Sequence, residues 1–140
     1  MENQAKVGVG VMIFKDGKIL LGKRKGGLGE GEYGFPGGHL EYMETFEACA
    51  KRETDEECGV EIDNIQFQLL GNVTKYAPKH YVHLTVKADW KNGEPQVCEP
   101  DRAEHWRWYS LSDLPQPLFE MAKISIESYQ SGKNYFDNVA

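Results

Sequence analysis

The segment that decides the fold runs from residue 38 to residue 60 and reads Gly38-His-Leu-Glu-Tyr-Met-Glu-Thr-Phe-Glu-Ala-Cys-Ala-Lys-Arg-Glu-Thr-Asp-Glu-Glu-Cys-Gly-Val60. From Thr45 to Cys58 it contains neither Gly nor Pro and is rich in Ala, Glu, Lys and Arg. Gly59 follows at the position where a residue in the left-handed conformation ends many helices. The sequence therefore predicts a helix over residues 45–58.

The predicted helix carries an acidic stripe. At 100° per residue, four side chains fall within about 60° of one another: Phe46, Ala50, Glu53 and Glu57. Glu56 lies beside this stripe, so three carboxylates converge near the C-terminal end of the helix, where the helix dipole already disfavours negative charge. Arg52 neutralises part of this charge, and hard divalent cations prefer carboxylate oxygens. The alternative is a solvated acidic face, but the spacing turns Glu53 and Glu57 inward and favours a Mg²⁺ or Mn²⁺ site.

The same segment resembles the Nudix box, which reads Gly, five residues, Glu, seven residues, then Arg-Glu-U-x-Glu-Glu-x-Gly-U, where U is a bulky aliphatic residue. Every fixed polar and glycine position is met, and the one departure is Thr54 at an aliphatic position. We expect slightly weaker core burial at Thr54 and no change in chemistry. The likeness to MutT-type Nudix domains extends to Gly34-Phe-Pro-Gly-Gly38 and Trp106-Arg-Trp108, and Leu21-Gly-Lys-Arg-Lys-Gly26 is similar to the Nudix hydrolase 15 group of nucleoside triphosphate diphosphatases.

The resemblance implies an α+β fold, the Nudix αβα sandwich with a mixed central sheet and a loop-helix-loop, in a single domain of residues 1–140. It implies that the metal ligands are Glu53, Glu56 and Glu57 together with the backbone carbonyl of Gly37 or Gly38. Glu53 is also the first candidate for the base that orients or deprotonates water. Glu44 and Arg52 resemble the family's structural pair, in which the guanidinium holds the helix and its carboxylates in place.

The family often supplies a further acid from a distal loop. Glu99 occupies roughly the expected place and Glu104 is the second candidate, whereas a plain polar loop is the alternative. Lys23, Arg24 and Lys25 would place cations beside the box, with Arg24 favoured for phosphate contact, and the alternative there is a basic turn. Aromatic faces stack on nucleobases, and the candidates for a base pocket, each of which could instead be core, are Tyr33, Phe35, His83 and Phe119. Glu120 stands where the Nudix hydrolase 15 group has an aromatic residue, so the purine preference of that group is not carried over.

The segments on either side of the helix read as strands and turns. Residues 6–14 and 18–23 flank Asp16-Gly17 and predict a β-hairpin, which is followed by a Gly-rich loop over 25–31. Strands are predicted over 65–70, 80–90 and 105–109. A short helix between Ser112 and Pro115 and a C-terminal helix over 118–129 complete the α+β pattern.

The composition fits one packed globular domain of 140 residues, 40% of them hydrophobic. A formal charge of −6 disfavours binding to duplex nucleic acid, which is a polyanion.

Since no stretch suits a membrane span or a secretion signal, we expect no membrane partner and a cytoplasmic location. The three cysteines, Cys49, Cys58 and Cys98, have no metal-ligand spacing and are expected to be free thiols. A homodimer is left open.

The resemblance predicts an enzyme that binds a nucleotide and uses Mg²⁺ or Mn²⁺. We expect hydrolysis of nucleoside triphosphates, either normal dNTPs or oxidised ones such as 8-oxo-dGTP, to nucleoside monophosphate and pyrophosphate, as in nucleotide-pool sanitation. The alternative substrates are ADP-ribose, dinucleoside polyphosphates, mRNA caps and dihydroneopterin triphosphate. A non-catalytic, nucleotide-sensing Nudix domain is the alternative from another functional class, and the complete set of box acids counts against it.

Overall fold

Strand β1 (Lys6–Lys15) lies at the centre of the sheet in the computed structural model, which describes residues 3–140. One edge of β1 pairs in parallel with β6 (Tyr81–Asn92). Next to β6 lies the antiparallel strand β5 (Glu61–Val73), and β8 (Tyr135–Val139) follows in parallel at the outer edge. The sheet is therefore mixed, as the sequence predicts.

The other edge of β1 is shared between two partners. Strand β2 (Lys18–Arg24) pairs with β1 only beside the connecting turn and then diverges from it. The short strand β4 (Gly37–His39) pairs with β1 where β2 has moved away, while β3 (Tyr33–Gly34) and β7 (Ala103–Ser110) pair with β2. This divergence opens the sheet beside the glycines that precede the acidic helix.

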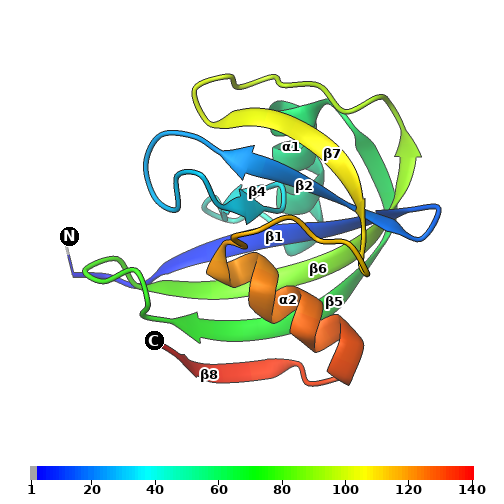
Figure 1. Cartoon of the computed structure of the whole chain (residues 1–140). Helices are drawn as coiled ribbons and strands as arrows, with labels where there is room; N and C mark the ends of the chain where they lie inside the picture. Colours follow the sequence, from blue (N-terminus) through cyan, green and yellow to red (C-terminus); the bar gives the residue numbers. More distant parts are fainter. Residues whose placement is uncertain (1–2) are drawn as a thin grey trace.

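Two helices cover opposite sides of the strands, with α2 (Glu120–Ser131) in front and α1 (Phe46–Cys58) behind them in Figure 1. Successive side chains of a strand point to opposite faces, so β1 contributes to both helix interfaces. The core on the α1 side contains Val11, Ile13, Ala50 and Cys58, and a core on the α2 side contains Met12, Ala122 and Ile126. Within residues 3–140, neither helix is long and apolar enough to cross a membrane.

Helix α1 confirms the predicted helix over 45–58 and its two ends. The hydroxyl of Thr45 accepts a hydrogen bond from the N–H of Ala48 at 3.1 Å, and Gly59 has a φ of +67°. Two details of the prediction were wrong. Phe46 does not begin a buried stripe, because the first turn of α1 is exposed and Phe46 retains 45% of its accessible surface. Thr54 is fully buried rather than weakly buried, and its Oγ1 has no hydrogen-bond partner.

The predicted hairpin and C-terminal helix are present, and the latter is shifted to Glu120–Ser131. The short helix predicted after Ser112 is wrong: residues 111–113 form a turn, in which the hydroxyl of Ser110 accepts the N–H of Ser112. Strands β3, β4 and β8 were not predicted. The first two hold only two and three residues, and Asp137 and Asn138 give β8 a weak strand signal.

Candidate active site

The carboxylates of α1 lie against the Gly37-Gly38 backbone. The N–H of Gly37 donates a hydrogen bond to Glu57 Oε2 at 2.9 Å. A Cβ on Gly38 would overlap the carboxylate of Glu53, and a Cβ on Gly37 would overlap the carbonyl oxygen of Val9. Only glycine therefore allows β4 to lie between β1 and the acidic helix.

Arg52 holds these carboxylates from one side. Its Nε and Nη2 donate to the two oxygens of Glu44 at 2.7 and 3.0 Å, which is a bidentate pair. Its Nη1 donates to Glu53 at 2.8 Å and to Glu56 at 3.4 Å. The bonds from Arg52, and then the N–H of Glu41, lower the pKa of Glu44 to about 2. Arg52 is thus fixed by Glu44 and fixes Glu53 in turn.

Burial and mutual repulsion make two of the carboxylates unstable as anions. Burial raises the pKa of Glu57 above its ordinary value, and the negative charges of Glu53 and Glu99 raise it further against the opposing hydrogen bond from Gly37. Burial likewise raises the pKa of Glu53, although Arg52 opposes the shift. Since both groups face a cavity, a cation placed there would stabilise their charged forms.

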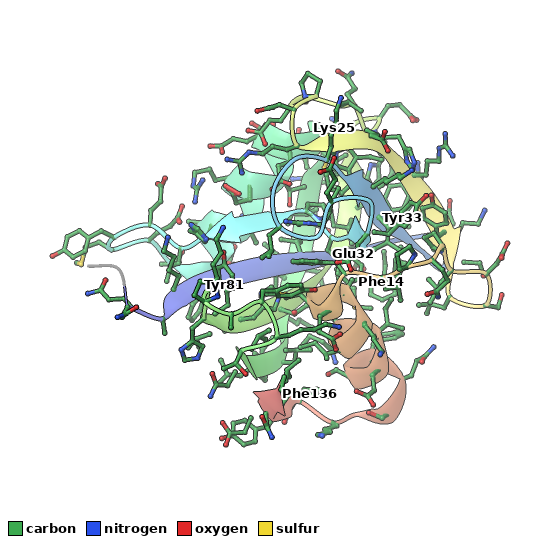
Figure 2. The ribbon with its side chains drawn as sticks, turned by 60° about the vertical axis from the view of Figure 1, so that its left-hand side comes forward. Phe14, Lys25, Glu32, Tyr33, Tyr81 and Phe136 are labelled. Carbon is green, nitrogen blue, oxygen red and sulfur yellow. The ribbon has the colours of Figure 1, made fainter. Side chains whose placement is uncertain are left out.

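A cavity of about 820 Å³ lies between these carboxylates, the loop after β2 and the N-terminal end of α2. Nucleotide-sized ligands occupy pockets of this order, about 300–1,000 Å³. Its floor is Gly8, Gly10 and His83 on strands β1 and β6. Figure 2 turns the loop that carries Lys25 toward the viewer, and Tyr81 at the start of β6 lies below and to the left of it.

Arg24 and Phe119 form one wall of the cavity. The Arg24 guanidinium lies 3.9 Å above the Phe119 ring, and its Nε donates to the carbonyl of Leu28 at 2.9 Å. The opposite face of Phe119 stacks on Tyr76, with ring centroids 5.1 Å apart. Burial lowers the pKa of Arg24, and the negative charge of Glu57 opposes this shift. The wall thus combines a rigid aromatic surface with a cation near the carboxylates.

His83 is a neutral part of the floor. Its ring lies over two glycines, and a Cβ on Gly10 would approach its Nε2 to 2.9 Å. Burial lowers the pKa of His83 to about 4. The imidazole is therefore uncharged at neutral pH and offers a flat surface and hydrogen-bonding nitrogens.

Three further cations line the cavity: Lys25, Lys79 and Arg102. We call these three the cationic rim. The sequence predicts Lys25 as part of the basic run beside the box, and it did not predict the other two. Nearby, the rings of His39 and Tyr81 stack with centroids 5.8 Å apart. Burial and then the positive charges of Lys6, Arg102 and Lys79 lower the pKa of His39. The only sequence signal for Lys79 and Arg102 was their position in loops that flank predicted strands. Many surface cations share such a position.

The packing of the acidic helix against a glycine pair agrees with a match to known proteins. The family described as NUDIX domain matches residues 4–131. The chain belongs to the Nudix family. A MutT NUDIX hydrolase from Burkholderia pseudomallei has a solved structure with a TM-score of 0.85 and 38% identity, covering 89% of this chain and 98% of that one.

Two curated relatives carry different substrate names. An oxidized purine nucleoside triphosphate hydrolase of Danio rerio is 32% identical over 111 residues, which are 75% of this chain and 66% of that protein. An ADP-ribose pyrophosphatase of Methanocaldococcus jannaschii is 34% identical over 131 residues, which are 91% of this chain and 75% of that protein. Nudix relatives of this chain are thus named as hydrolases, with more than one substrate.

The Nudix carboxylates fit a divalent cation by their chemistry. As the side chains are arranged within residues 3–140, no three carboxylate, imidazole or thiol groups form a metal-binding cluster. Arg52 directs Glu53 and Glu56 toward its guanidinium, while Glu57 turns to the N–H of Gly37. The available donors are nevertheless hard oxygens around a cavity, and the raised pKa values of Glu53 and Glu57 indicate uncompensated charge. Mg²⁺ or Mn²⁺ would supply the missing positive charge.

Most of the predicted Nudix site residues meet in this one cavity. Those that line it are Arg24, Phe35, Gly37, Gly38, Arg52, Glu53, Glu56, Glu57, His83, Glu99 and Phe119. Glu44 lies behind them, bound to Arg52. Lys23 does not reach the cavity: its Nζ lies 3.3 Å from Glu104 Oε2, because the neighbouring Arg24 takes the cavity side of the strand. Glu104, which pairs with Lys23, does not line the cavity either. Tyr33 also lies elsewhere, packed against His105 and Tyr109.

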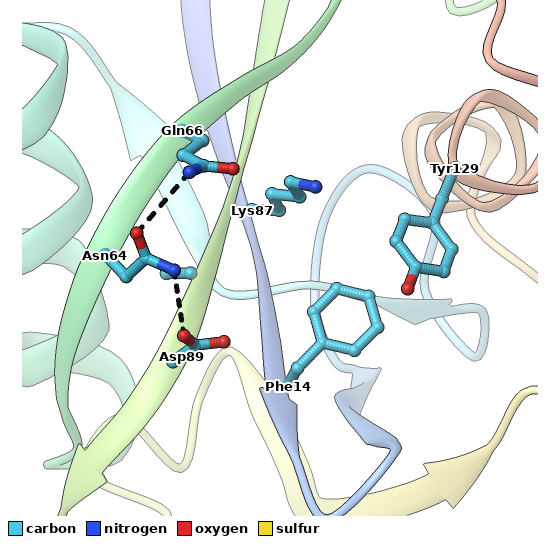
Figure 3. Close-up of a pocket in the computed structure, with 7 residues that line it drawn as sticks. Phe14, Asn64, Gln66, Lys87, Asp89 and Tyr129 are labelled. Atoms are coloured by element: carbon cyan, nitrogen blue, oxygen red, sulfur yellow. Dashed lines mark hydrogen bonds between the residues drawn. The ribbon is translucent and has the colours of Figure 1, made fainter.

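A second, smaller pocket of about 250 Å³ lies at the other end of α2, beside Tyr129 (Figure 3). Three of its polar side chains bind one another, whereas Lys87 forms no ion pair within 4.0 Å in residues 3–140. Asn64 donates to Asp89 at 3.0 Å, and Gln66 donates to Asn64 at 3.4 Å. The Phe14 ring packs against Tyr129 with centroids 4.8 Å apart. This pocket contains none of the residues that the Nudix resemblance assigns to the site.

Proposed function

We propose that the chain hydrolyses nucleoside triphosphates to nucleoside monophosphate and pyrophosphate in a reaction that requires Mg²⁺ or Mn²⁺. The observation that carries the proposal is the position of Glu53 and Glu57 against Gly37 and Gly38, in a cavity whose opposite wall is Arg24 on Phe119. Acids for metal ions, a cation for phosphate and an aromatic surface for a base thus face one space. Normal or oxidised dNTPs, such as 8-oxo-dGTP, are the leading substrates.

A Mg²⁺ or Mn²⁺ ion bound here would supply a Lewis acid that lowers the pKa of water and neutralises phosphate oxygens. Glu53, Glu56 and Glu57, with the backbone of Gly37 or Gly38 and with Glu99, would hold it. The water oxygen forms a bond to the α phosphorus, the bond from that phosphorus to the bridging oxygen breaks, and pyrophosphate leaves with the electron pair. Glu53 takes the proton from water. Arg52 and Glu44 keep Glu53 in place for this transfer.

The other residues of the cavity bind and orient the nucleotide. Arg24 binds phosphate oxygens, since its guanidinium donates from a fixed plane above Phe119. Phe35 and His83 form the surface for the base, and the neutral His83 adds no charge beside it. Phe119, which packs between Arg24 and Tyr76, holds the Arg24 guanidinium in place. The formal charge of −6 supports a small nucleotide rather than a duplex as partner. We also propose a cytoplasmic location. The reaction proposed here does not depend on whether the chain is a monomer or a homodimer.

ADP-ribose is the second candidate substrate. It is favoured by the Methanocaldococcus jannaschii relative, whose match extends over 91% of this chain. ADP-ribose has the same diphosphate linkage, so the carboxylate side of the cavity suits it equally. The two candidates differ in what lies beyond the cleaved bond: two phosphates in one, and a phosphate that carries a neutral ribose in the other.

A nucleotide panel with Mg²⁺ tests the proposal. We expect turnover of one or more dNTPs, with nucleoside monophosphate and pyrophosphate as the first products on ion-exchange chromatography, and loss of turnover on addition of EDTA. Nucleoside diphosphate and orthophosphate as first products would contradict the assigned bond. Faster turnover of ADP-ribose than of every dNTP would select the second candidate. Undiminished hydrolysis without metal ions would overturn the mechanism.

A further inference from the structure

The cavity contains more positive charge than the proposed reaction has used. Among its cations, Arg52 is engaged by Glu44 and Glu53, and Arg24 is fixed on Phe119 and Leu28. By contrast, within residues 3–140 none of the three residues of the cationic rim forms an ion pair within 4.0 Å. Unpaired cations that line one cavity of an acidic protein attract an anionic ligand group.

The rim is assembled from three separate loops that the backbone ties down. Lys25 follows β2, Lys79 precedes β6 and Arg102 precedes β7. The N–H of Lys25 donates to the carbonyl of Arg102 at 2.8 Å, and the N–H of Lys79 donates to the carbonyl of Tyr76 at 3.0 Å. Lys79 and Arg102 are also close enough for their charges to act on the same His39 ring. Three loops that are distant in the sequence therefore place these cations along one cavity.

From this geometry we infer that Lys79 and Arg102 bind the terminal phosphate of the nucleotide and select a triphosphate over a shorter phosphate chain. This inference rests on the proposed function and extends it. In this arrangement the surface at Phe35 and Met121 accepts the nucleoside, and the carboxylates of α1 lie beside the phosphates near the cleaved bond. Lys79 and Arg102 then contact the terminal phosphate, which is the phosphate farthest from the nucleoside. ADP-ribose carries no terminal phosphate and would leave the rim unpaired.

The test measures binding without turnover. The probe is dGTP with a methylene group in place of the α–β bridging oxygen, titrated calorimetrically with Mg²⁺ present, and the comparison ligand is the corresponding dGDP analogue. For the double variant Lys79→Met/Arg102→Met we expect the Kd of the triphosphate analogue to rise on the order of tenfold, and that of the diphosphate analogue to change less than threefold. The ratio of kcat/KM for dGTP over dGDP should fall by the same factor.

The matched control is Lys123→Met/Arg107→Met, which removes one Lys and one Arg that are exposed and lie outside the cavity. It should change both Kd values less than twofold, so a loss caused by net charge alone would appear there too. An equal loss for both analogues in the rim variant, or no loss, would overturn the inference. Inorganic tripolyphosphate that binds as tightly as the dGTP analogue would assign the rim to free polyphosphate instead, which also overturns it.

The outcomes separate the inference from the proposed function. If the parent binds the triphosphate analogue but hydrolyses no nucleoside triphosphate, the proposed function fails and the rim is still judged by the two Kd ratios. If the parent binds neither analogue, the rim assignment fails with it. If turnover follows the proposal but the rim variant keeps its preference for triphosphate, only the inference fails.

Discussion

The two pockets at the ends of α2 contain similar side chains in different electrostatic conditions. Each combines carboxylates or amides with a cation and an aromatic ring. In the small pocket of Figure 3, Asn64 binds both Asp89 and Gln66, so its one carboxylate has a neutral hydrogen-bond donor. In the large cavity, burial and the negative charges of neighbouring carboxylates raise the pKa of both Glu53 and Glu57. The comparison indicates that neighbouring buried carboxylates beside a cavity, rather than the presence of polar residues, mark the place for a ligand.

The largest expected effect is the loss of Glu57. Glu57→Gln keeps an oxygen that can accept the N–H of Gly37, so the fold should be retained, but it removes a charge proposed to bind metal. We expect kcat for a dNTP to fall by about a thousandfold or more. Steady-state kinetics with Mg²⁺, together with a thermal melt to verify folding, measure this effect.

The matched control makes the same chemical change in the small pocket. Asp89→Asn also replaces a carboxylate with an amide, and its oxygen can still accept from Asn64. We expect activity within twofold of the parent and stability within about 0.5 kcal/mol. A Glu57→Gln variant within threefold of the parent, or an equally damaged Asp89→Asn variant, would abolish the distinction between the two pockets.

The next effect concerns a residue that positions the carboxylates. Arg52→Ala should lower kcat on the order of a hundredfold, because a displacement of about 1 Å at a catalytic group has a cost of that size. KM should stay near the parent value, since Arg24 and the rim still bind phosphate. Arg52→Lys cannot form the bidentate pair with Glu44 and should recover only part of the loss. A tenfold higher KM with unchanged kcat would make Arg52 a direct substrate contact.

The pH dependence of stability tests whether His83, in the floor of the large cavity, is held uncharged. The pKa of His83 is about 4 in the folded chain and about 6.5 in the unfolded one, so the unfolded chain binds more protons between these values. Stability should therefore decrease as pH falls, by about 2 to 3 kcal/mol from this group between pH 7 and pH 4.5. His83→Gln lacks this titration, and urea unfolding at both pH values should show a smaller loss than in the parent. Equal losses would contradict the burial of His83.

The smallest effect concerns a buried hydroxyl group that lies outside both pockets. Thr54 Oγ1 is buried and has no partner, yet Thr54 does not line either pocket. Thr54→Val removes the hydroxyl at nearly constant shape and should stabilise the chain by about 1 kcal/mol, with activity within twofold. Urea unfolding and kcat measure the two quantities. A destabilised or catalytically impaired variant would give the hydroxyl a role that its surroundings do not indicate.

Local chemistry explains which parts could be predicted from the sequence. The limits of α1 follow from a Thr that caps one end and a Gly that ends the other, and the inward direction of Glu53 and Glu57 follows from helical spacing. The burial of Phe46 could not be judged in this way, since it depends on how far the first turn extends beyond the strands. Lys79 and Arg102 depend on loop conformation, because nothing local to either residue directs it to the cavity. The partner of each strand is set by distant residues too, whereas β8 was missed because Asp137 and Asn138 weaken its local strand signal.

The parallel pairing of β1 with β6 also determines when the cavity can form. In this register Gly8 lies opposite His83, so the floor requires two segments that are far apart in the chain. Contacts of such sequence separation are slow to form, since a long loop must close first. A nascent chain that has emerged from the ribosome only through α1 has its three box carboxylates but lacks the floor and the wall at Phe119. Ligand affinity is therefore a property of the completed chain, and a bound nucleotide should protect the whole molecule against unfolding rather than any one part of it.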